Sequence, residues 1–308
     1  MEFISKCGLM VEPQEGMASN ELLDAAAFAE TSRFGYFFRS DHLLPTSRKK
    51  GLDSPECWTT LGAIAVRTAK IRFGPMVSPM GFRNPALLAR MACTVNSLSG
   101  GRLQLGVGAG WYRDEYRAHG LKFPNLETRK RQFREALRII RPLTQVGRVD
   151  FEGKYFSAHL DDLPKLKEKV HLIIGGRAPS IVKETAAYGD EWNFFAPVPD
   201  AFDAIKRHLD GSGRRIEISR MGPFVIAENA ASLKERLKRG MRENRASGDE
   251  DAYARALRKR GWLLGTERDF PDCVNELRER GVGKFYFQVW DTGNKEQVDL
   301  LARVLRGM

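Results

Sequence analysis

The stretch "GRLQLGVGAGWYRDEY", residues 101–116, decides how the rest of the chain is interpreted. A strand-like run, 103–105, leads directly into glycines at 106, 108 and 110. Strands that end in glycine bring backbone close to a phosphate or a flat ligand. A dinucleotide-binding turn requires G-x-G-x-x-G, and Trp111 stands where that pattern, counted from Gly106, needs its third glycine. The Rossmann interpretation is therefore weak, and another α/β architecture has to account for these glycines.

Length and composition indicate a globular α/β chain. The 308 residues are 42% hydrophobic, which is enough for a large core in one domain or in two smaller ones. No run of about 18 apolar residues occurs, and the first residues lack a basic leader followed by an apolar stretch. We therefore expect a soluble, cytoplasmic protein without a membrane segment. The four cysteines, at 7, 57, 93 and 273, form no C-x-x-C pair, which fits free thiols better than disulfides or zinc.

The formal charge of +11 raises the question of a nucleic-acid partner. Many basic residues lie in helix-like segments with acids between them, as in "ETRKRQFREALRIIR" and "SLKERLKRGMRE". This pattern is typical of solvated helix faces, and no zinc-finger, helix-turn-helix or RNA-binding motif accompanies it. We expect no specific nucleic-acid binding, while an anionic cofactor or substrate stays compatible with the charge.

Strand-like and helix-like segments alternate along the chain. The expected strands cover eight ranges: 2–11, 36–42, 71–79, 102–108, 170–176, 191–197, 216–227 and 283–290. Helices are expected between them, at 19–35, 54–68, 84–101, 127–146, 179–189, 200–210, 267–281 and after the last strand. An irregular stretch fills 147–169, and two charged helical stretches precede residue 267. This alternation predicts a parallel sheet in a single domain, 1–308, as a closed (β/α)8 barrel, with an open doubly wound sheet as the alternative.

Unusual residues cluster where the predicted strands end. The clusters are Ser40-Asp41-His42, Val77-Ser78-Pro79, Gly108-Ala109-Gly110-Trp111, Gly175-Gly176-Arg177 and Trp192-Asn193. In a (β/α)8 barrel all these strand ends converge on one mouth, and that mouth carries the chemistry. This convergence favours the barrel over the open sheet.

Four segments together resemble the luciferase-like monooxygenase superfamily, and within it the oxidoreductases that use the deazaflavin coenzyme F420. They are "RSDHLLP" (39–45), "FGPMVSPMGFRNPALLAR" (73–90), "GGRLQLGVGAGWYRDEYRAHGLKFP" (100–124) and "LIIGGRAPSIVKETAAYGDEWN" (172–193). The resemblance implies a (β/α)8 barrel, here with an insertion after the fourth βα unit and extra helices before the last strand.

The resemblance implies catalytic roles at the end of the second strand. In the related sugar-phosphate dehydrogenases the residue matching His42 transfers a proton, and the one matching Asp41 lies beside the deazaflavin, where Ser40 is also expected. Histidine can exchange protons near neutral pH, and a neighbouring carboxylate can select its tautomer. From the residues alone, an Asp that caps a turn beside a packed His is the simpler interpretation. The chain has Trp111 and Thr46 where those dehydrogenases have a glutamate and a tryptophan, so that particular reaction is not expected.

The third strand and the 101–116 stretch are expected to hold the cofactor ring. The resemblance implies a non-prolyl cis peptide bond at Pro75–Met76, with Val77 and Ser78 lining the ring, whereas the residues alone favour an ordinary trans strand. Gly106, Gly108 and Gly110 would let the fourth strand end against a planar ring system, and tight barrel packing is the competing explanation. Trp111 and Asp114 would flank this pocket.

The fifth and sixth strands are expected to hold the rest of the cofactor. Gly175-Gly176-Arg177-Ala178 precedes a helix that starts at Pro179, and glycine amides at a helix start bind phosphate. An ordinary strand-to-helix turn is the alternative. Trp192 and Asn193 would form the far wall of the cofactor pocket, although an indole at a strand end is more often core.

These features favour an enzyme that transfers hydride between F420 and a small organic substrate. An FMN-dependent monooxygenase of the same superfamily is the first alternative, and a flavin- or deazaflavin-binding protein without turnover is the second. The sequence is compatible with a homodimer, predicts no metal ligands, and does not identify the substrate.

Overall fold

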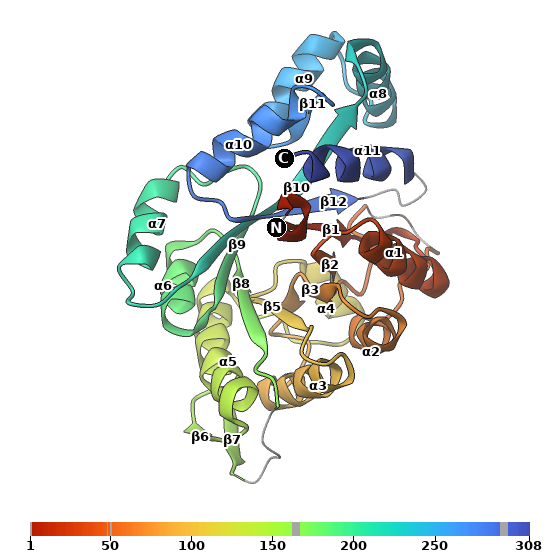
Figure 1. Ribbon diagram of the computed structural model, residues 1–308. Coiled ribbons are helices and arrows are strands. Elements are labelled where there is room, and N and C mark those ends of the chain that lie inside the picture. The colour runs from red at the N-terminus through yellow and green to blue at the C-terminus, as the bar shows by residue number, and fades with distance from the viewer. Residues whose placement is uncertain (1, 48, 50, 162–166, 290–294) are drawn as a thin grey trace.

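The computed structural model of the chain describes residues 2–47, 49, 51–161, 167–289 and 295–308. Its centre is a ring of parallel strands surrounded by helices (Figure 1). The strands of this ring are β1 (Cys7–Val11), β2 (Tyr36–Arg39), β3 (Arg72–Pro75), β4 (Ser78–Pro79), β5 (Gln104–Gly108), β8 (His171–Gly175), β9 (Glu191–Phe195), β10 (Glu217–Ala227) and β12 (Lys284–Val289).

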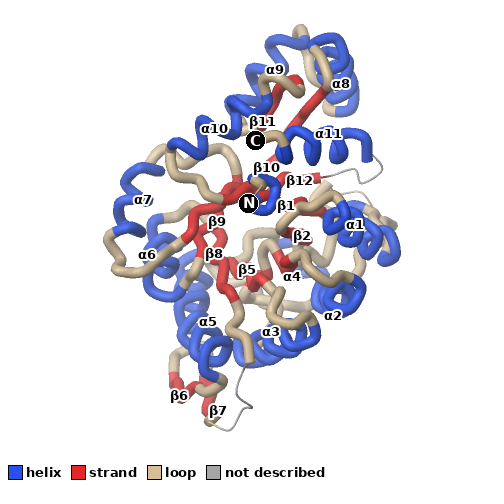
Figure 2. The backbone as a smooth tube through the Cα atoms, in the orientation of Figure 1, coloured by secondary structure: helices blue, strands red, loops and turns tan. Residues whose placement is uncertain are grey.

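The hydrogen-bonded strand order closes the sheet into a barrel. It runs β3-β2-β1-β12-β10-β9-β8-β5-β4, and β3 and β4 are successive pieces of one interrupted strand. Ser78 of β4 pairs with Val107 of β5, and Phe73 of β3 makes a parallel bridge to Leu103 just before β5. Counting β3 and β4 as one, eight strands of the described residues complete the circle, which confirms the predicted (β/α)8 fold over the open doubly wound sheet. Figure 2 shows these strands inside a layer of helices.

Helices cover the outside of the barrel. They are α1 (Ser19–Thr31), α2 (Cys57–Arg67), α3 (Pro85–Leu98), α4 (Arg113–Ala118), α5 (Leu126–Val146), α6 (Pro179–Tyr188), α7 (Phe202–Asp210), α8 (Ala230–Glu243), α9 (Glu250–Lys259), α10 (Phe270–Glu279) and α11 (Lys295–Arg306). The longest, α5, begins where the Asn125 side chain accepts from the Thr128 N–H and ends at Gly147, whose φ is +75°. None of the described helices combines the length and apolar composition that a bilayer span requires.

Two regions contain strands that the sequence did not predict. The stretch expected to be irregular, 147–169, carries an antiparallel hairpin of β6 (Val149–Glu152) and β7 (Ser157–Leu160). β11 (Leu263–Thr266) pairs with the outer end of β10 and, with α8 and α9, forms a lobe beside the barrel (Figure 1). Residues 3–6, expected within the first strand, form a 3-10 helix (Phe3–Lys6) instead. The last residue of the predicted strand 283–290, Trp290, lies outside the described residues.

Side chains alternate between the barrel interior and the helix layer. In β12, Lys284, Tyr286 and Gln288 belong to the interior, while Phe285 and Phe287 belong to the main core between sheet and helices. The same period of two operates in β9, where Trp192 and Phe194 pack against Phe202 of α7. This alternation decides which strand residues can reach the barrel mouth.

The interruption between β3 and β4 contains a cis peptide bond at Met76–Val77, not at Pro75–Met76 as predicted. Pro75 is still in register with Arg39 of β2, and the Met76 N–H donates to the Arg39 carbonyl. The strand pairing therefore extends through Met76, and the break follows one bond later.

Glycines in β5, the strand paired with β4, and in β8, the strand paired with β5, make room for this bulge. A Cβ atom at position 108 would lie 2.6 Å from Val77 Cγ2, and one at 175 would lie 2.8 Å from Val77 Cγ1. A Cβ atom at position 106 would collide with the Pro75 carbonyl oxygen. Gly106 and Gly108 thus admit the bulge itself, so tight barrel packing, the competing explanation, is correct for these two glycines.

Replacing Gly106 with Ala is expected to lower the free energy of unfolding by about 1–3 kcal/mol or more, because its methyl group meets rigid backbone. Gly62→Ala is the matched control, since nothing lies within 4 Å of a Cβ there and the residue is inside α2. That control should gain up to about 1 kcal/mol. Urea denaturation of both variants measures the difference, and equal stabilities would contradict the packing described here.

Candidate active site

A cavity of about 350 Å³ opens at the carboxyl ends of the barrel strands. Its wall includes Glu12 after β1, His42 after β2, Trp111 after β5, Phe195 at the end of β9 and Gln288 near the end of β12. These residues are far apart in sequence, and only the closure of the barrel brings them together. The position is the one at which (β/α)8 enzymes carry their active sites.

His42 is held by a carboxylate from a different loop. Its Nδ1 lies 3.1 and 3.2 Å from the two carboxylate oxygens of Glu115, which is fully buried in α4. The Glu115 carboxylate also accepts from the Leu43 N–H at 3.0 Å. A carboxylate can only accept, so this contact assigns a proton to Nδ1 and leaves Nε2 as the ring nitrogen for a ligand.

The surroundings of His42 favour its protonated form. Burial of the ring works against the imidazolium, but the hydrogen bond and charge of Glu115 outweigh burial and raise the pKa of His42. The negative charges of Glu12 and Asp41 raise the pKa of His42 further. The cavity therefore contains a histidine that keeps its proton to a higher pH than a free imidazole.

Asp41 is occupied by other partners and does not orient His42. Arg83 donates to both of its oxygens, at 2.6 and 3.1 Å, and the Ser78 hydroxyl donates to one at 2.6 Å. Burial raises the pKa of Asp41, and Arg83 opposes that rise. The expectation that the adjacent carboxylate selects the His42 tautomer is corrected: Glu115 does so, because Asp41 faces Arg83.

The structure brings only part of the predicted site into the cavity. The predicted residues that line it are Ser40, Asp41, His42, Met76, Val77, Gly110 and Trp111. The predicted residues outside this lining are Pro75, Ser78, Gly108, Ala109, Asp114, Gly175, Gly176, Arg177, Ala178, Trp192 and Asn193.

Two of these displacements have a clear physical cause. Asp114 is exposed in the first turn of α4, and its neighbour Glu115 turns inward instead, since adjacent helical residues lie about 100° apart. Trp192 is fully buried between β9 and α7 and donates from its indole to the Gly176 carbonyl at 2.8 Å. The wall expected from Trp192 comes from Phe195, which lies on the opposite face of the same strand.

Sequence reasoning missed several lining residues, chiefly Glu12, Glu115, Phe195, Met221 and Gln288. Glu12 directly follows the first strand, and Gln288 is a polar residue inside a hydrophobic strand, so both carried a usable signal. Glu115 carried none, because its burial depends on a loop 72 or more residues away in the chain.

The start of α6 is suited to an anion. Its N-cap, Ala178, supplies no side-chain cap, and the exposed side chain of Arg177 stands just before it. The hydroxyl of Ser180 is buried and has no hydrogen-bond partner among the described residues. Gly176 has a φ of +146°, which glycine adopts readily. An uncapped helix start with an unpaired hydroxyl favours a bound phosphate.

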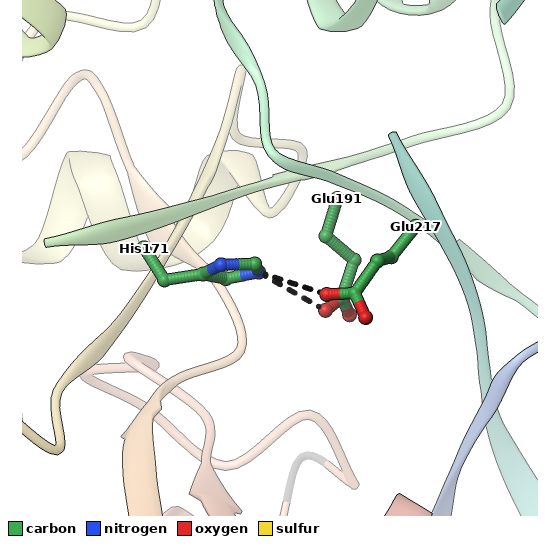
Figure 3. A group of neighbouring side chains, drawn as sticks. All are labelled: His171, Glu191 and Glu217. Atoms are coloured by element: carbon green, nitrogen blue, oxygen red, sulfur yellow. Dashed lines mark hydrogen bonds and ion pairs between the residues drawn. The ribbon is translucent and has the colours of Figure 1, made fainter. Parts of the chain in front are cut away.

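At the other end of the barrel, His171, Glu191 and Glu217 lie together at the starts of β8, β9 and β10 (Figure 3). The Lys284 ammonium group lies 2.6 Å from Glu191 and 2.7 Å from Glu217. Burial alone would raise the pKa of Glu191, but Lys284 and His171 outweigh it and lower the pKa to about 2. Lysine thus supplies the positive charge between these carboxylates, and the cluster is a structural salt-bridge network at the face of the barrel opposite the cavity.

The sequence model of the family described as luciferase-like monooxygenase matches residues 1–298. The chain therefore belongs to that family. Fold and cavity agree with this membership, because both follow a (β/α)8 barrel with its candidate site at the carboxyl ends of the strands.

Individual relatives point to F420-dependent proteins. An F420-dependent glucose-6-phosphate dehydrogenase of Microbacterium testaceum is 35% identical over 173 residues, covering 55% of this chain and 50% of the relative. The chain thus spans about half the length of that relative. The dehydrogenase of the same name from Kribbella flavida is 30% identical over 85% of this chain and 76% of the relative. Among solved structures, an F420-dependent secondary alcohol dehydrogenase with an F420-acetone adduct has a TM-score of 0.79 over 97% of both chains at 19% identity, which supports the fold.

Replacing Glu115 with Gln is expected to lower the pKa of His42, because the amide keeps the shape of the side chain but removes its charge. NMR titration of the imidazole ring protons measures this shift directly. His159 is an internal control, since Asp150 and Glu152 raise its pKa and Glu115 does not contact it. An unchanged His42 titration in the variant would contradict the assigned hydrogen bond.

Proposed function

We propose that the protein is an F420-dependent oxidoreductase that transfers hydride to or from a small organic substrate in the barrel-mouth cavity. The observation that carries this proposal is the bulge at Met76 and Val77, which projects into the cavity from an interrupted barrel strand. Gly106, Gly108 and Gly175 provide the space for it. Relatives that are F420-dependent by name support the choice of cofactor.

The residues present fit the cofactor at two places. Met76 and Val77 would support the deazaflavin ring, and Gly110 with Trp111 would border it. The phosphate would lie at Gly175–Ala178 and the start of α6, where the unpaired Ser180 hydroxyl and Arg177 offer donors. Bound F420 supplies a ring carbon that accepts or donates the hydride.

His42 would manage the proton that accompanies the hydride. When an alcohol carbon loses hydride and becomes a carbonyl carbon, its oxygen loses a proton, and His42 Nε2 is the group we assign to receive it. In the reverse direction the same nitrogen returns the proton to the oxygen. Glu115 holds the ring through Nδ1, and Asp41 acts through its contacts with Arg83 and Ser78 rather than on the substrate.

FMN-dependent monooxygenation stays the alternative, because both cofactors carry a tricyclic ring and a phosphate. The homodimer, the cytoplasmic location and the absence of specific nucleic-acid binding stay predictions from the sequence.

Ser180→Asp is expected to weaken F420 binding at least tenfold, because a carboxylate would face the phosphate at the start of α6. Ser180→Asn is the matched control, since it has nearly the same shape without the charge and should change the affinity less than about threefold. Fluorescence titration with F420 measures both. Equal affinities for the two variants would contradict the phosphate position. Gly176 is less suitable for this test, because its positive φ would strain any replacement.

A further inference from the structure

We propose that Glu12 and Gln288 form a substrate-recognition subsite that accepts a hydrogen-bond donor from an uncharged small molecule and disfavours phosphorylated compounds. This inference rests on the proposed function, because it concerns the substrate that meets the cofactor in the same cavity. Glu12 follows β1 and Gln288 belongs to β12, the strand paired with β1. Both residues line the cavity.

Hydrogen bonds fix the orientation of the Gln288 amide. Its Nε2 donates to Glu12 Oε1 at 2.6 Å. A carboxylate oxygen only accepts, so the amide nitrogen has to face Glu12 and the amide oxygen has to face away. The other oxygen of Glu12 accepts from Gln14 Nε2 at 2.8 Å, and Gln14 accepts from the Ser40 hydroxyl at 2.5 Å. The donor and the acceptor of each hydrogen bond from Gln288 through Glu12 and Gln14 to Ser40 are therefore fixed.

The amide oxygen of Gln288 is an acceptor without a donor. Gln288 is 5% exposed, and its Oε1 is buried with no hydrogen-bond partner among the residues that the structure describes. A buried carbonyl oxygen usually has a partner, and because Gln288 lines the cavity we assign its unpaired oxygen to a donor from the substrate. A hydroxyl or N–H group of the substrate supplies that donor.

The charges of the cavity select against an anion. Its lining contains the carboxylates of Glu12, Asp41 and Glu115, and no lysine or arginine among the described lining residues. Arg83, which reaches Asp41, also binds Glu56 at 2.6 Å. A phosphate at the subsite would meet the Glu12 carboxylate, and His42, the one cationic side chain of the described lining, already pairs with Glu115, so like-charge repulsion disfavours the phosphate.

The rest of the lining suits an apolar substrate body. Met10, Met221 and Phe195 contribute hydrophobic surface, and Trp111 stands at the rim with 65% of its surface exposed. A compact alcohol with a hydrocarbon skeleton matches this combination of one acceptor and apolar walls.

Three probes that share a cyclohexyl ring separate the effect of a hydrogen-bond donor from the effect of charge. Cyclohexanol carries a hydroxyl donor, methoxycyclohexane carries none, and cyclohexyl phosphate carries a negative charge. Calorimetric titration into the F420-loaded protein should give cyclohexanol a dissociation constant at least tenfold lower than either of the others. Binding of cyclohexyl phosphate or methoxycyclohexane as tightly as cyclohexanol would overturn the subsite, and so would the absence of cyclohexanol binding.

Gln288→Met should reduce the preference for cyclohexanol over methoxycyclohexane to within about threefold and leave F420 affinity within threefold. Gln104→Met is the matched control, because Gln104 is also 5% exposed but begins β5 at the opposite end of the barrel. It should keep the preference. A larger loss of F420 affinity than of cyclohexanol affinity in Gln288→Met would assign the acceptor to the cofactor and overturn the proposal.

F420 binding is measured separately by fluorescence, so a failure of the proposed function can be told apart from a failure of the subsite. If F420 does not bind, the proposed function is wrong, and the same probe titrations on the protein alone still decide the subsite. Circular dichroism melting of both variants checks that they fold.

Discussion

The close fit between the Pro75–Val77 bulge and the glycines of β5 and β8 is the constraint on which the rest of the site depends. A Cβ atom at position 106 would collide with the Pro75 carbonyl oxygen, and Cβ atoms at 108 and 175 would crowd the Val77 side chain. Without these three glycines the third strand could not turn into the barrel and still pair with β5. Met76 and Val77 of the same bulge line the cavity, so the packing that closes the barrel also shapes the site.

Side-chain hydrogen bonds and ion pairs join loops that follow different strands at the barrel mouth. Glu115, carried by α4 after β5, binds both His42 and the Leu43 N–H after β2. Arg83, after β4, joins Asp41 to Glu56 in the same way. These contacts hold the histidine between two fixed loops, which is how a barrel mouth made of flexible connections presents a side chain in one orientation.

The sequence predicted the barrel because alternating strands and helices carry a regular signal. It placed His42 at the barrel mouth because the predicted strand 36–42 ends there, and the catalytic role of His42 stays a prediction from the family resemblance. It expected Trp192 at the mouth, whereas the structure has Trp192 packed against α7 and Phe195 in the cavity lining, because alternate residues of a strand point to opposite faces of the sheet. It assigned the cis bond one residue early, since the register that holds Met76 against Arg39 is a property of two paired strands. The sequence could not predict the role of Glu115, because only tertiary packing decides whether Asp114 or Glu115 points into the barrel.

We propose that the support formed by Met76 and Val77 serves a deazaflavin ring, and comparing two cofactors on the unmodified protein tests this most directly. Fluorescence titration with F420, run in parallel with FMN under the same salt and pH, gives both dissociation constants. The proposed function predicts that F420 binds at least tenfold more tightly than FMN. Tighter binding of FMN, or no binding of F420, would contradict it.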